Sequence, residues 1–99
     1  MQNFEREFEE FCKTSDINSG KGGSYAKAIR YLCDYMGIYE MNEENINKIK
    51  SIEESIKDKN SAFYQGLLKF LSGRRQKSYL EGGFISAALK YLFVYKNNV

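Results

Sequence analysis

The stretch GGSYAKAIRYLCDY (residues 22–35) returns in altered form sixty residues later as GGFISAALKYLFVY (residues 82–95). The second copy, apolar almost all round, predicts a helix over residues 84–96. The first predicts a helix over residues 24–36, with Ser24 as its N-cap and Gly37 as its C-terminal stop. Its apolar side chains lie three and four residues apart, on one helix face: Tyr25, Ala28, Ile29, Leu32, Cys33 and Met36.

Two segments outside the repeat also have the period of an amphipathic helix. Residues 2–13 place phenylalanines at intervals of four and three residues, and four of the five other positions between Phe4 and Phe11 are glutamates. Residues 43–57 place isoleucines on a narrow seam with charges around it. Asn42 can cap this second helix, and the pattern allows a break near Ser51.

A third segment, residues 61–72, is capped by Asn60 or Ser61 and is followed by a short turn that starts at Ser78. Gly66 lies inside this helix, where it costs about 1 kcal/mol relative to Ala. We therefore expect another helix to approach it closely. No segment alternates apolar and polar residues, so no sheet is expected. The sequence predicts one all-α domain over residues 1–99, a compact bundle of about five helices around a central apolar C-terminal helix.

Composition excludes several functional classes. The chain has no apolar run long enough to span a membrane, and its acidic start is not a signal peptide, so we expect a cytoplasmic protein without a membrane partner. Histidine is absent, which removes the commonest general base and metal ligand. We expect no catalysis, no metal and no cofactor. Cys12 and Cys33 fall on apolar helix faces, which predicts two reduced buried thiols, with a disulfide between them as the alternative.

The charge is distributed unevenly along the chain. Residues 1–50 hold seven Lys or Arg and nine Asp or Glu, whereas residues 51–99 hold eight and four. Between Lys59 and Leu80 there are five basic residues and no acid. A local excess of positive charge of this kind indicates a phosphate-bearing partner.

The candidate phosphate-binding residues fall into two groups. In the first, Lys21 lies in a glycine-rich loop, and Ser24, Lys27 and Arg30 follow it on the predicted helix, the two cations on its non-core face. The second group lies in the connector before the last helix: Arg74, Arg75, Lys77 and Tyr79. Cations can neutralise phosphates, and hydroxyl groups can add hydrogen bonds to them. A solvated surface charge is the alternative for every one of these basic residues.

The pair of segments SYAKAIRYLC (residues 24–33) and ISAALKYLF (residues 85–93) resembles the first and last helices of the SAM-like core-binding domains of tyrosine recombinases, the phage-type integrases. The chain is also similar to helical modules of restriction-type endonucleases. The resemblance implies a non-catalytic bundle that grips duplex DNA. It would place Lys27 and Arg30, together with Arg74 and Lys77, against the DNA backbone. The catalytic recombinase domain has no counterpart in this sequence.

A protein–protein interaction module is the alternative function. It would be a small phage or bacterial inhibitor or adaptor, and one version is a homodimer through residues 84–95. The nearly all-apolar last helix favours this alternative, since such a helix either lies in the core or presents a face to a partner. The acidic first helix favours it as well, because it would repel DNA.

Overall fold

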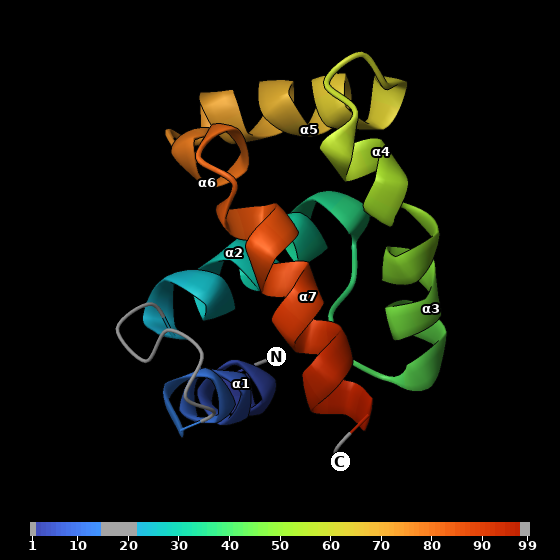
Figure 1. Ribbon diagram of the computed structural model, residues 1–99. Helices are drawn as coiled ribbons and strands as arrows, with labels where there is room; N and C mark the ends of the chain where they lie inside the picture. The colour runs from blue at the N-terminus through green and yellow to red at the C-terminus, as the bar shows by residue number, and fades with distance from the viewer. Residues whose placement is uncertain (1, 15–21, 98–99) are drawn as a thin grey trace.

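The computed structural model describes residues 2–14 and 22–97, and this part of the chain consists of helices without any strand (Figure 1). The all-α prediction is confirmed. The described residues form seven helices rather than about five: α1 (Gln2–Thr14), α2 (Gly22–Met36), α3 (Glu43–Ser51), α4 (Glu53–Lys57), α5 (Ala62–Gly73), α6 (Ser78–Glu81) and α7 (Phe84–Asn97).

The two additional helices have separate local causes. The helix expected over residues 43–57 is split at Ile52, whose φ of −108° and ψ of 6° lie outside the α-helical range. The split falls next to Ser51, where the sequence pattern allowed a break. The turn that starts at Ser78 closes into the single helical turn α6, because the amide of Gly82 donates to the carbonyl of Ser78 at 2.8 Å.

The helix ends follow the capping residues with one exception. Asn42 accepts a hydrogen bond from the amide of Asn45 at 2.9 Å, and Ser61 accepts one from the amide of Tyr64 at 3.0 Å. Gly37 ends α2 with a φ of 73°, which a residue without a Cβ adopts readily. The prediction that Ser24 caps α2 is wrong. The helix already begins at Gly22, so Ser24 lies within its first turn.

Helix α7 forms the centre of the bundle, as expected, and packs against α1, α2, α4 and α6 (Figure 1). One side of it is buried, with Ile85 and Leu92 fully inaccessible to solvent. The opposite side is only partly covered, because Lys90 and Val94 are exposed. The C-terminal helix is therefore central to the core but presents a narrow outer stripe to solvent.

Gly66 marks a close approach between α5 and α2. A Cβ atom at this position would collide with the hydroxyl group of Tyr35. The Tyr35 ring also lies 5.3 Å from the ring of Phe70 and 5.5 Å from that of Phe63, both on α5. The expected close approach is confirmed, and a tyrosine side chain rather than a helix backbone makes it.

Cys12 and Cys33 are both buried thiols, and no disulfide joins these two described residues. Burial raises the pKa of the Cys33 thiol to about 12 and that of the Cys12 thiol to about 11. Both groups therefore stay protonated at neutral pH. Within residues 2–14 and 22–97, no helix is both long enough and apolar enough to cross a membrane.

Candidate nucleic-acid interface

The segment between α5 and α6, residues 74–77, carries three of the predicted cations, and we call it the basic connector. Its turn is closed by the amide of Gln76, which donates to the carbonyl of Leu71 at 2.8 Å. Within the turn Arg75 has a φ of 60°, a left-handed conformation that costs about 1 kcal/mol or more for a residue with a Cβ. Arg75 and Lys77 are exposed. The turn therefore keeps two neighbouring cations in solvent.

The basic connector lies against the outer face of α2. A guanidinium nitrogen of Arg74 is 3.2 Å from a carboxylate oxygen of Asp34, and the same guanidinium lies 5.2 Å from the centre of the Phe70 ring. One turn earlier on α2, the ring of Tyr31 meets that of Tyr79 edge-on at 5.0 Å. These contacts join two segments that lie about forty residues apart in the sequence.

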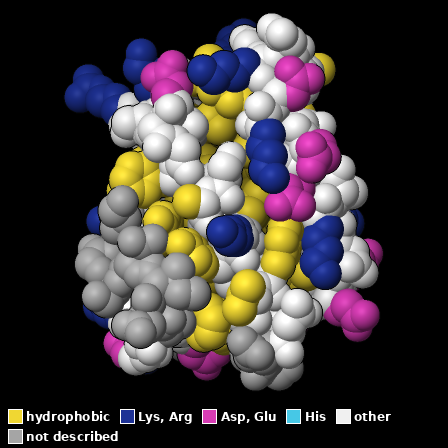
Figure 2. Space-filling view, viewed as in Figure 1, with side chains coloured by type: hydrophobic (Ala, Val, Ile, Leu, Met, Phe, Trp, Pro, Cys, Tyr) yellow, Lys and Arg dark blue, Asp and Glu magenta, His cyan; other side chains and the backbone are white. Residues whose placement is uncertain are grey.

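Arg30 continues this surface along α2. Its guanidinium lies 5.3 Å from the centre of the Tyr31 ring, and it forms a 3.5 Å ion pair with Glu5 of α1. Lys27 is exposed one turn nearer the start of α2. The structure thus brings Lys27, Arg30 and the basic connector to one side of α2. Figure 2 shows Lys and Arg side chains gathered at the end of the molecule where α5 and α6 meet.

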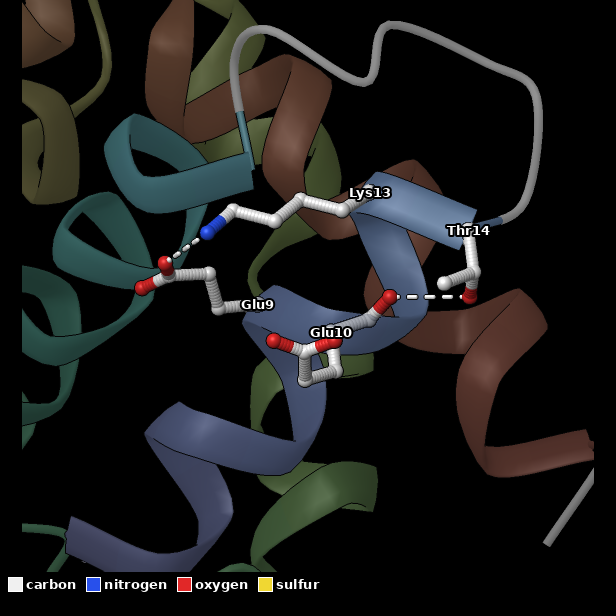
Figure 3. Close-up of polar contacts among 4 residues, drawn as sticks. All are labelled: Glu9, Glu10, Lys13 and Thr14. Carbon is white, nitrogen blue, oxygen red and sulfur yellow. Dashed lines mark hydrogen bonds and ion pairs between the residues drawn. The ribbon is translucent and has the colours of Figure 1, made fainter.

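The start of α2 has a different electrostatic environment, because α1 runs beside it. The Glu9 carboxylate lies about 3.8 Å from where a Cβ on Gly23 would be, and Lys13 pairs with Glu9 at 2.7 Å (Figure 3). Glu5, Glu9 and Glu10 line an open hollow of about 400 Å³ together with Arg6 and Arg30. These carboxylates would repel a phosphate at this end of α2.

Ser24 is thus less favourably placed to meet a phosphate than the residues of the basic connector. Ser24 is half-buried in the first turn of α2, and Lys21 lies outside the described residues. Sequence reasoning missed Glu5 and Asp34 as partners of the two arginines. Both acids occupy ordinary solvent-facing helix positions, so only the packing of α1 and α5 on α2 shows which cations they meet.

No group of three or more acidic or thiol side chains within residues 2–14 and 22–97 is placed to hold a metal ion. Tyr95 donates a hydrogen bond from its hydroxyl group to Glu7 at 3.2 Å, and its pKa is raised by burial and by this contact. At neutral pH the Tyr95 hydroxyl group, like the two thiols, therefore stays protonated.

Comparison of the chain with protein-family models, with curated proteins and with solved structures finds no match.

Proposed function

We propose that the protein is a non-catalytic DNA-binding module that grips the duplex backbone through the basic connector and the outer face of α2. The contact between Arg74 and Asp34 carries this proposal, because it places two separate basic segments on one surface. That surface holds five cations: Lys27, Arg30, Arg74, Arg75 and Lys77. Glu5 and Asp34 pair with two of them, Glu9 and Glu10 line the hollow beside Arg30, and Glu81 is exposed on α6. The positive charge is therefore densest at the basic connector.

The two ion pairs on this surface do not prevent phosphate binding. The side chains of Arg30 and Arg74 are 43% and 42% exposed, and solvated pairs of this kind contribute at most about 1 kcal/mol. Exchanging a carboxylate for a DNA phosphate therefore costs little. Within the described part of the chain, Arg75 and Lys77 take part in no ion pair, so they can bind a phosphate without first losing a carboxylate partner.

Backbone contacts of this kind predict a salt-dependent affinity with little sequence preference. Each neutralised phosphate contributes about −0.9 to the slope of log affinity against log salt concentration. Three to five contacts would give a slope of roughly −3 to −4.5.

The test is a salt titration of duplex binding with two variants of equal charge. Replacing Arg74, Arg75 and Lys77 by alanine should make the slope shallower by about three. The matched control replaces Lys48, Lys50 and Lys57, which are exposed on α3 and α4, and should leave the slope close to wild type. Failure of the wild type to bind at about 50 mM salt, or equal effects of the two variants, would contradict the proposal.

The protein-interaction alternative gains limited support from the exposed apolar side chains. Among the described residues the large apolar groups with substantial exposure are Tyr39, at 76%, and Val94, at 40%. A homodimer through residues 84–95 would have mainly Val94 and the partly buried Phe84, Ala87 and Phe93 to offer, because the other apolar side chains of α7 are buried in the core. Light scattering at increasing protein concentration tests this version.

A further inference from the structure

The turn that ends α5 has the same hydrogen-bond pattern as the turn that ends α2. At the end of α5 the amide of Gln76 donates to the carbonyl of Leu71, five residues earlier, and Arg75 has a φ of 60°. At the end of α2 the amide of Ile38 donates at 2.9 Å to the carbonyl five residues earlier, and Gly37 has a φ of 73°. Both are Schellman turns, in which one left-handed residue follows the helix and the next residue closes the turn.

The two Schellman turns differ in the residues at these two positions. The left-handed position favours glycine, and the closing residue commonly packs an apolar side chain against the end of the helix. The α2 turn meets both preferences, because Gly37 is left-handed and Ile38 is buried. The α5 turn meets neither, because an arginine is left-handed and a glutamine closes the turn. The α5 turn is therefore held less firmly than the α2 turn.

The side chain of Gln76 adds a second unfavourable feature. The residue is half-buried, and its carboxamide oxygen Oε1 is inaccessible to solvent. Among the described residues, Oε1 is the one buried side-chain oxygen or nitrogen without a hydrogen-bond partner, and Arg75 is the one non-glycine residue with a positive φ. An unpaired buried acceptor favours any arrangement that returns it to water or to a ligand.

Both unfavourable features lie in the basic connector, where the proposed DNA surface is most positive. Gln76 is placed between Arg75 and Lys77, two exposed cations. Once its side chain leaves the interior, the Nε2 group of Gln76 can donate to a phosphate oxygen, which an apolar closing residue could not do. Local conformational costs that concentrate in one surface segment are typical of a binding site.

We propose that the α5 turn is a switch that is closed in the free protein and opens on DNA, so that Gln76 leaves its buried position and donates from Nε2 to a backbone phosphate. Opening also releases Arg75 from its left-handed conformation. This inference rests on the proposed DNA-binding function and adds Gln76 to the residues that contact DNA. Since the open turn is the binding-competent state, any change that stabilises the closed turn should weaken the apparent affinity by the same factor.

The first test is Gln76→Met, which keeps the length of the side chain and removes the unpaired oxygen. The variant should raise the melting temperature of the free protein by about 4–8 °C. It should bind a paired duplex about fivefold more weakly than the wild type. The slope of log affinity against log salt concentration should stay the same, because no charge is lost. A side chain with a merely structural role would not raise stability and lower affinity together.

The matched control is Gln65→Met, the same substitution at an exposed glutamine of α5. The side chain of Gln65 has a hydrogen-bond partner, because its Nε2 group donates to the carbonyl of Lys59. This variant should therefore gain no stability, and it should bind the duplex as the wild type does.

The second test compares Arg75→Gly with Arg75→Ala. Both variants lose the same charge, so both should make the salt slope shallower by about one. Glycine adopts the left-handed conformation of the closed turn readily, whereas alanine does not. The glycine variant should therefore have the higher melting temperature of the two and bind the duplex about fivefold more weakly than the alanine variant.

Amide hydrogen exchange measures the opening directly. The amide of Gln76, which closes the α5 turn, should exchange faster in the DNA complex than in the free protein. The amide of Ile38, which closes the α2 turn, is the internal control and should exchange at the same rate in both.

The outcomes separate this inference from the function on which it rests. The switch would be overturned, with backbone binding left in place, if Gln76→Met binds as the wild type does or melts at a lower temperature. Equal affinities of Arg75→Gly and Arg75→Ala, or exchange of the Gln76 amide that is no faster in the complex, would overturn it as well. If the wild type binds no duplex at about 50 mM salt, the proposed function fails and the inference fails with it.

Discussion

Helices α2 and α7 come from the two repeated segments, and they agree in the core while differing at the surface. Ala28 and Ala88 are both fully buried, and so are Leu32 and Leu92. The shared basic position differs: Arg30 pairs with Glu5, whereas Lys90 faces solvent. The residues that are identical in the two copies are therefore explained by packing in the core. Residues that serve binding are expected where the surroundings of the two helices differ.

The largest expected effect concerns Leu32 and Leu92, the aligned core leucines of the two copies. Leu32→Ala and Leu92→Ala should each lower the free energy of unfolding by about 2–5 kcal/mol, because each opens a cavity at a fully buried site. Urea unfolding followed by circular dichroism measures the loss. Val94→Ala, on the exposed stripe of α7, is the control and should change stability by no more than about 0.5 kcal/mol. A loss below about 1 kcal/mol at either leucine would break the equivalence.

The second effect concerns the shared tyrosines, Tyr35 and Tyr95. The Tyr95 hydroxyl group donates to Glu7, whereas the Tyr35 hydroxyl group fills the space left by Gly66. Gly66→Ala should therefore destabilise the fold by about 1–2 kcal/mol, since overpacking outweighs the gain of about 1 kcal/mol in helix propensity. In a Tyr35→Phe background the same substitution should become neutral or stabilising. An equal loss in both backgrounds, measured by urea unfolding, would show that the hydroxyl group is not the obstacle.

The sequence predicts the features that depend on residues close together in the chain. It does not predict the features that depend on how distant helices pack together. The bounds of α1, α5 and α7 follow from apolar period and caps to within one or two residues. Helix α6 is four residues long and too short to show a period, and the extension of α2 to Gly22 comes before its apolar stripe. The neighbours of Arg30 and Arg74 depend on which helices pack together, and no local pattern contains that information.

The smallest effect concerns Cys33 of α2, a buried thiol at the position where the aligned residue of α7 is Phe93. Desolvation raises the pKa of the Cys33 thiol from 9.0 to about 12, so the unfolded chain loses this proton at lower pH than the folded protein. The thiol therefore favours the folded state fully below about pH 9, and this contribution is lost as the pH rises toward 12. Cys33→Ala should make the alkaline fall in urea midpoint shallower. An unchanged pH profile would show that the thiol does not contribute.

Thiol labelling gives an independent measurement of the same feature. At neutral pH the native protein should react with a thiol reagent only as fast as the chain opens, because the thiolate is the reactive form and both thiols are buried and protonated. Rapid labelling of the folded protein would contradict the burial of Cys12 and Cys33.

The contact between Tyr95 and helix α1 has a consequence for how the chain folds. The Tyr95 ring packs on Phe8 at 5.8 Å, and its hydroxyl group bonds Glu7, a separation of 88 residues. On the ribosome α1 and α2 emerge long before α7, so their apolar faces stay partly exposed until α7 is available to pack against them. The described helices should therefore reach their native packing only once α7 has been synthesised, in one cooperative step rather than helix by helix.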